Sequence, residues 1–252
     1  MLRISLVDFL NARPLTWGLL REPPAGVTVT RDAPSVCADK LARGEADVGL
    51  IPSIEYQRIP GLRVVPTLGI AASSEVRSVL LVSDVSREKI RSVALDPASR
   101  TSATLVRLLL KRVYGLGPEY LDSGRADARL IIGDPALKAR LNGHVVLDLA
   151  AEWRAFSGHP FVFAFWAARE DFATPELAGL LRRSYEAGQS RFDQLVREES
   201  QQSGLSEPVI EDYLRHALHY ELDRGDLEGL DLFYRMAAEE GLIEKAKPLH
   251  PI

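Results

Sequence analysis

Short apolar segments alternate with amphipathic segments along the first two thirds of the chain. The apolar segments predict strands at residues 2–7, 27–30, 48–51, 64–65, 78–82, 92–95 and 130–132. Helical spacing of apolar residues predicts helices at 35–43, 101–114 and 135–141, and Pro14 suits the first turn of another helix. Because strand–helix–strand alternation produces parallel strands covered by helices, this pattern predicts an α/β fold with mostly parallel sheets.

The pattern changes after Phe172. Residues 174 to about 202, 207–219 and 226–240 are three amphipathic segments with helical spacing, and no strand is predicted between them. We expect these helices to pack their apolar stripes against one part of the α/β fold.

A short internal repeat, called the echo below, indicates two similar halves. Residues 44–51 and 124–131 share the pattern G-x-A-D-x-x-L-I, 80 residues apart, and polar loops follow at Pro52-Ser53 and Gly133-Asp134. An eight-residue echo can arise by chance or from the general chemistry of helix-to-strand corners. The paired loops favour two lobes around a cleft, because open α/β sheets bind ligands at the carboxyl ends of their strands.

Composition narrows the class of protein. The chain has 252 residues, of which 46% are hydrophobic and 26% charged, as in ordinary globular proteins. The net charge of −4 argues against a general nucleic-acid binder, and a single cysteine excludes a disulfide framework. The longest dense apolar run, 160–168, is shorter than a membrane span, and residues 1–7 lack signal-peptide features. We therefore expect a cytoplasmic protein without membrane partners.

Three hydroxyl side chains gather before the predicted helix at 101–114. Ser99, Thr101 and Ser102 follow a predicted strand, and the unpaired amides of a helix N-terminus favour a carboxylate or a small oxyanion. Ordinary N-capping is the alternative interpretation. A nucleotide is disfavoured because the sequence has no glycine-rich phosphate loop.

Other candidate groups carry weaker signals. Asn11 follows the first strand, where its amide suits either a ligand or a turn, and Arg13 suits either a carboxylate partner or a solvated surface position. Cys37 lies within a predicted amphipathic helix and is expected to face the protein core. The five histidines show no metal-ligand spacing, and there is no G-x-S-x-G motif. We therefore expect no metal and no classical catalytic triad.

Six motifs together resemble one enzyme family. They are FLNARPL (9–15), GLIPSIEY (49–56), SVLLVS (78–83), SRTS (99–102), IGDPAL (132–137) and GHPFVFAFW (158–166). In this order they are similar to the chorismate dehydratases of the futalosine route to menaquinone, which have the type II periplasmic-binding-protein-like fold. This resemblance implies two lobes, with residues 1–82 and 167–252 in lobe 1, residues 83–166 in lobe 2, and C-terminal helices on lobe 1.

The resemblance also implies a reaction. Chorismate, a dicarboxylate, would lose water in the cleft to give 3-[(1-carboxyvinyl)oxy]benzoate, without a cofactor. By the same resemblance, Asn11 and Ser78 lie near the reacting ring as catalytic residues. The remaining implied residues bind substrate: Ser53, Ser99, Thr101, Ser102, Gly133 and Asp134.

Two alternatives stay open. The related 1,4-dihydroxy-6-naphthoate synthases resemble the chain in outline and are thought to use a histidine base, for which His159 is the candidate. A non-catalytic solute-binding protein for a small carboxylate is the other, because a fold does not fix a function. The groups that neutralise the second carboxylate also stay open, with Arg13, Arg77 and backbone amides as candidates, and the oligomeric state is not predicted.

Overall fold

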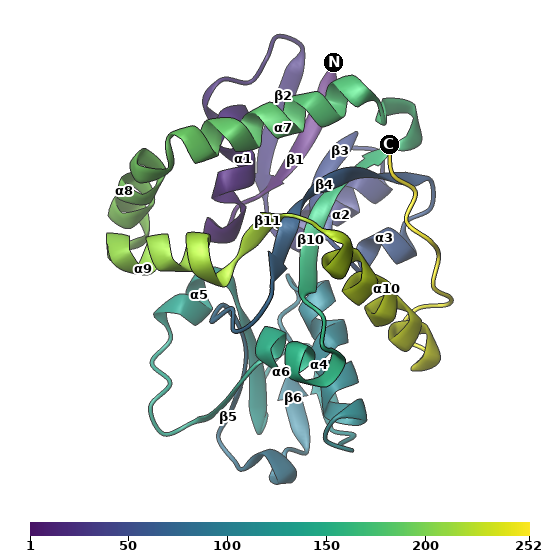
Figure 1. Cartoon of the computed structure of the whole chain (residues 1–252). Helices are drawn as coiled ribbons and strands as arrows, with labels where there is room; N and C mark the ends of the chain where they lie inside the picture. Colours follow the sequence, from purple (N-terminus) through teal and green to yellow (C-terminus); the bar gives the residue numbers. More distant parts are fainter.

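The fold consists of two β-sheets flanked by helices. In the computed structural model, which describes residues 1–252 apart from the side chain of Pro66, the six-stranded sheet lies in the upper part of Figure 1 and the five-stranded sheet in the lower part. We call each sheet with its helices a lobe, the first lobe holding the six strands. The predicted two-lobed α/β fold is thereby confirmed.

The first sheet is built around two strongly buried strands. β3 is buried at every position, and β10 at all but its last residue, as expected for apolar strands in the middle of a sheet. In spatial order the strands are β11 (His219–Glu221), β4 (Leu62–Ala72), β10 (Phe161–Arg169), β3 (Val48–Pro52), β1 (Leu2–Val7) and β2 (Val27–Asp32).

The second sheet is smaller. In spatial order its strands are β7 (Glu119–Leu121), β6 (Ser92–Ala94), β8 (Ala128–Ile132), β5 (Val79–Ser83) and β9 (Val145–Asp148). Residue 4 of β1 pairs with residue 48 of β3 in the first sheet, and residue 93 of β6 pairs with residue 128 of β8 in the second, both in parallel. The echoed segments therefore occupy equivalent positions in the two sheets.

Both sheets are mixed, which corrects the expectation of mostly parallel strands. β1 pairs in parallel with β2 and β3, but β10 runs antiparallel to β3 and β4. In the second sheet β5 runs antiparallel to β8 and β9. The physical reason is that the chain leaves the first lobe after β4 and returns with β10, so each entering strand runs against its neighbours.

The sheets to which β5 and β10 belong do not match the predicted lobe boundaries at residues 82 and 166. β5, with residues 79–83, pairs within the second sheet, whereas β10, with residues 161–169, pairs within the first. The chain therefore crosses between the sheets before β5 and again between β9 and β10. The limits of the lobes as domains stay a prediction.

Helices cover the faces of both sheets. The α-helices are α1 (Arg13–Arg21), α2 (Pro34–Ala42), α3 (Glu55–Arg58), α4 (Arg100–Arg112), α5 (Gly133–Lys138), α6 (Leu149–Ser157), α7 (Pro175–Ser190), α8 (Phe192–Ser203), α9 (Glu207–Asp212) and α10 (Arg224–Glu239). Short 3₁₀ turns are η1 (Leu10–Ala12), η2 (Arg87–Lys89) and η3 (Glu170–Phe172), and η4 (Tyr213–Ala217) is a π-helical turn. Among the described residues, no helix is long and apolar enough to cross a membrane.

The C-terminal region departs from the sequence pattern in two ways. The long helix predicted from 174 to about 202 is broken at Arg191 into α7 and α8. The expectation of no strand in this region is wrong, because β11 adds to the edge of the first sheet beside β4. A strand of three residues, His219–Glu221, is too short to show a periodic signal.

Candidate active site

A cavity opens between the two lobes at the carboxyl ends of β1, β3 and β8. Its empty space, counted together with the open solvent at its mouth, is ≈ 490 Å³. The first lobe lines it with Val7, Phe9, Asn11, Pro34, Pro52, Ile70, Phe163 and Ala164, and the second with Val79, Ser99, Thr101, Ser102, Ile132 and Gly133. This is the edge at which open α/β sheets bind ligands.

The first turn of α4 offers hydrogen-bond donors to this cavity. Ser99 occupies the N-cap position, but its side chain makes no capping hydrogen bond within the described part of the chain. The Ser99 hydroxyl therefore does not cap the amides at the N-terminus of α4. The positive end of the α4 dipole borders the cavity beside Ser99 and Ser102. This arrangement favours an anion over the N-capping alternative.

Thr101 and Ser53 link the two lobes beneath the cavity. The Thr101 hydroxyl accepts the amide of Ile54 at 3.2 Å and lies 3.4 Å from the Ser53 hydroxyl. Ser53 donates to the carbonyl of Val162 at 2.8 Å, and its own carbonyl accepts the hydroxyl of Tyr234 at 2.6 Å. Ser53 is fully buried and lies behind Pro52, so its side chain serves this link rather than the cavity wall.

The turn after β1 brings Asn11 into the cavity wall. Asn11 lies in η1, and its side-chain oxygen is buried without a hydrogen-bond partner among the described residues. An unpaired buried acceptor is costly, so a donor from a bound ligand would satisfy it. Phe9, from the same turn, packs against Gly133 of the other lobe, whose φ of +63° suits glycine.

Asp134 and Ser78 adjoin residues that line the cavity. The Asp134 carboxylate accepts the amide of Leu10 at 3.0 Å across the lobes. Ser78 is buried, its carbonyl accepts the amide of Gly133 at 2.7 Å, and the next residue, Val79, lines the cavity. The cavity therefore brings together Asn11, Ser99, Thr101, Ser102 and Gly133. Ser53 and Asp134 bind residues next to its wall, and the buried Ser78 adjoins two lining residues, Val79 and Gly133.

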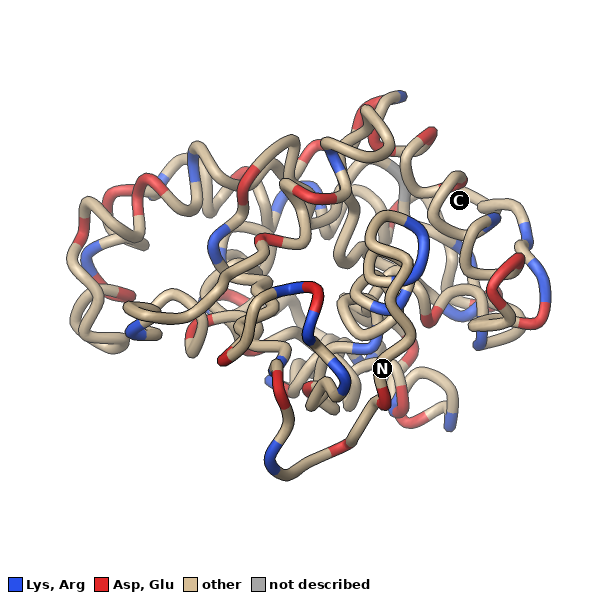
Figure 2. Tube along the Cα trace, turned by 90° about the horizontal axis from the view of Figure 1, so that it is seen from below, with Lys and Arg blue, Asp and Glu red and all other residues tan. Residues whose placement is uncertain are grey.

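The candidate arginines are already paired. Arg13 is buried, so the solvated surface position is wrong, and the carboxylates that its guanidinium binds belong to the protein, Glu199 at 2.8 Å and Asp8 at 2.6 Å. Arg77 pairs with Asp212 at 2.6 Å. The described lining residues include no lysine or arginine, and Figure 2 shows both signs of charge interspersed along the trace. Hydroxyls and backbone amides are therefore the groups that face an anion here.

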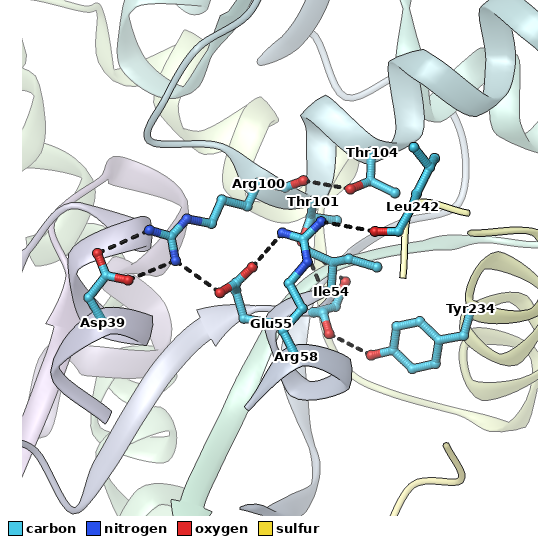
Figure 3. Close-up of polar contacts among 10 residues, drawn as sticks. Asp39, Ile54, Glu55, Arg58, Arg100, Thr101, Thr104, Tyr234 and Leu242 are labelled. Carbon is cyan, nitrogen blue, oxygen red and sulfur yellow. Dashed lines mark hydrogen bonds and ion pairs between the residues drawn. The ribbon is translucent and has the colours of Figure 1, made fainter. Parts of the chain in front are cut away.

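Arg100 follows the N-cap of α4 but extends toward the first lobe. Its guanidinium binds Asp39 at 2.8 Å and the buried Glu55 at 2.9 Å, and Arg58 also binds Glu55 at 2.7 Å (Figure 3). This network joins α4 to α2 and α3 across the cleft. The sequence does not predict this network, because the motif SRTS contains no information about the carboxylates on the other lobe.

The remaining nucleophile and base candidates lie away from the cavity. Cys37 lies in α2 with its side chain buried in the protein core. Burial raises the pKa of its thiol to about 12, so the thiol stays protonated. His159 is partly buried in the turn before β10 and is not among the described cavity-lining residues.

The fold and its cleft define the class of two-lobed, periplasmic-binding-protein-like α/β proteins. Solved structures share this fold: a protein of Archaeoglobus fulgidus has a TM-score of 0.78 at 16% identity, covering 96% of this chain and 98% of its own. The periplasmic aliphatic sulphonate-binding protein of Escherichia coli has a TM-score of 0.64 at 19% identity, covering 100% and 93%. At these identities the likeness concerns the fold.

Sequence similarity assigns the family. A family model described as Menaquinone biosynthesis matches residues 2–239, and the chain belongs to this family. A chorismate dehydratase of Thermus thermophilus is 30% identical over 91% of this chain and 93% of the relative. A chorismate dehydratase of Campylobacter jejuni is 33% identical over 63% of each chain. The resemblance predicted from the six motifs is thereby confirmed, and the chain is related to enzymes.

Proposed function

We propose that this protein is a hydro-lyase that converts chorismate to 3-[(1-carboxyvinyl)oxy]benzoate in the futalosine route to menaquinone, in the cytoplasm. The observation that carries the proposal is an uncharged, mostly apolar cavity between the lobes, with one amide and three hydroxyl side chains in its wall, in a chain 30% identical to a chorismate dehydratase. Such a cavity suits a small carboxylate held at the first turn of α4.

The reaction places modest demands on the protein. The C–H bond at the ether-bearing ring carbon breaks, its electrons form the new ring double bond, and the hydroxyl of the neighbouring carbon leaves with a proton as water. Aromatisation supplies the driving force, so no cofactor is needed. Holding one ring conformer against a base contributes up to roughly 7–11 kcal/mol in ideal cases.

The base is assigned to the substrate itself. Asn11 is a poor base, and its unpaired side-chain oxygen suits a hydrogen bond that orients the substrate. The enolpyruvyl carboxylate of chorismate lies close to the ring proton in its own molecule and accepts it. Asn11 and Ser78 then act as orienting groups near the reacting ring, while Ser99, Thr101 and Ser102 surround a carboxylate with Ser53, Gly133 and Asp134 in support.

Incubation of the purified chain with chorismate tests this proposal. Mass spectrometry should show a product lighter by one water, and its ultraviolet spectrum should show an aromatic ring. The variant Asn11→Ala should bind chorismate but lose turnover, and full activity in that variant would refute the role of Asn11. Binding by the wild type without turnover would instead favour a solute-binding protein, and turnover of a cyclic futalosine compound alone would favour the sister synthase with His159.

A further inference from the structure

The C-terminal helical segment reaches back to the inter-lobe crossing through Tyr213. The Tyr213 hydroxyl donates a hydrogen bond to the Ser78 hydroxyl at 2.7 Å, and both side chains are buried. Tyr213 begins the π-helical turn η4, which follows α9. π-Helical turns are rare and occur frequently at functional sites.

The residue before Ser78 has a strained conformation and also contacts this segment. Arg77 has a φ of +62°, which is unfavourable for a residue with a side chain. Its amide donates to Asp148 at 2.6 Å and its guanidinium binds Asp212 at 2.6 Å. Such strain persists where the surroundings over-determine it, and it clusters at functional sites. Consecutive residues, Asp212 and Tyr213, thus bind the side chains of the consecutive residues Arg77 and Ser78.

The direction of the Tyr213–Ser78 hydrogen bond decides whether the Ser78 hydroxyl is free to donate. Burial raises the pKa of Tyr213 well above its ordinary value, so the phenol stays protonated and donates. Because Ser78 Oγ accepts this bond, its own proton must point elsewhere, and the described residues supply no acceptor for it. The backbone around Ser78 borders the cavity, since Val79 lines it and Gly133 binds the Ser78 carbonyl.

We infer that Tyr213 is a positioning residue that orients the Ser78 hydroxyl as a hydrogen-bond donor to the substrate. This inference rests on the proposed function, in which Ser78 lies near the reacting ring. The oxygen that leaves as water gains negative charge as its bond to carbon breaks, and a donor already oriented toward it stabilises that charge without reorganisation. Without Tyr213, the Ser78 hydroxyl rotates freely and its proton is no longer directed.

The test compares two conservative tyrosine variants. Tyr213→Phe should lower kcat by about tenfold with KM within about twofold, because a bond used in the transition state is lost. Tyr220→Phe is the matched control, because the Tyr220 hydroxyl is equally buried but has no partner among the described residues. It should leave kcat unchanged. Equal losses of kcat in both variants, or a Tyr213→Phe variant that changes KM but not kcat, would overturn the inference.

A double-mutant cycle separates orientation from packing. If Tyr213 acts through Ser78, adding Tyr213→Phe to Ser78→Ala should cause no further loss of kcat, whereas a packing role gives the same loss in both backgrounds. Turnover by the wild type tests the proposed function separately. If the wild type binds chorismate without turnover, the same cycle is measured in Kd, where coupling supports the inference and additivity overturns it. If it neither binds nor turns over chorismate, both proposals fail.

Discussion

The carboxylate of Asp134 accepts the backbone amide of Leu10 at 3.0 Å, although 124 residues separate them in sequence. Leu10 belongs to η1, the turn that carries Asn11, and Asp134 lies in the first turn of α5 in the other lobe. The bond therefore fixes the position of Asn11 relative to the second lobe. The motif resemblance implied substrate binding by Asp134, which stays a prediction, and the bond to Leu10 indicates that Asp134 also orders the cleft.

Replacing Asp134 should weaken substrate binding through this contact. In Asp134→Ala the Leu10 amide loses its acceptor, and we expect KM for chorismate to rise by about tenfold, because hydrogen bonds to charged groups contribute about 1.5–3 kcal/mol. Asp134→Asn is the matched control, since its amide oxygen still accepts and should keep most of the affinity. Steady-state kinetics of both variants measure this, and equal defects would show that the charge matters rather than the bond to Leu10.

Gly133 should tolerate no side chain, for two separable reasons. Its φ of +63° strains any other residue, and a Cβ would approach the ring of Phe9 to 3.2 Å. Gly133→Ala should therefore lower the free energy of unfolding by about 1–2 kcal/mol and reduce affinity for chorismate. Gly143→Ala isolates the first reason, because Gly143 has a φ of +85° and nothing within 4 Å. If urea unfolding and affinity change equally in both variants, the Phe9 contact has no role.

The echo predicted the two lobes because it encodes a local structure. In the first lobe the Asp47 carboxylate accepts the amide of Arg3 at 2.9 Å, and in the second the Asp127 carboxylate accepts the amide of Arg91 at 2.8 Å. Each aspartate thus holds the start of the parallel neighbouring strand. A residue pattern of eight positions contains this information, so the repeated α/β unit was predictable from the sequence.

The contacts between the lobes were not predictable in the same way. The Tyr213–Ser78 and Arg100–Glu55 contacts join residues that are far apart in sequence, and their formation depends on how the sheets sit against each other. The hydroxyls at the start of α4 were identified because their chemistry and their place before a helix are local features. The buried pair of Arg13 with Glu199 was missed, because Glu199 lies 186 residues away.

The hydroxyls at the first turn of α4 should control affinity more than turnover. Ser99→Ala and Ser102→Ala together remove two hydroxyls that border the cavity, and we expect KM to rise by about tenfold or more with a smaller change in kcat, because ground-state anion contacts are lost. Thr104→Ala is the matched control on the same helix, since its hydroxyl binds the Arg100 carbonyl at 3.0 Å. Unchanged KM in the double variant would exclude this turn as the carboxylate site.

The buried Asp47 predicts how stability depends on pH. Burial alone would raise the pKa of Asp47, but hydrogen bonds from the guanidinium and amide of Arg3 outweigh it and hold the pKa below the ordinary value of 3.8. Because the folded protein binds this proton more weakly than the unfolded chain, the stabilisation is fully present above the unfolded pKa. It is lost as the pH falls through the lower folded pKa.

Asp47→Asn should therefore destabilise the fold by about 2 kcal/mol near neutral pH and by progressively less below about pH 4, where the wild type loses the same charged contact. Urea unfolding of both proteins from pH 7 to pH 3 measures this convergence. Asp122→Asn, at an exposed position, is the control for a change of net charge. A difference between wild type and Asp47→Asn that stays constant down to pH 3 would mean that the Asp47 contact contributes through its shape rather than its charge, because a neutral hydrogen bond would not titrate.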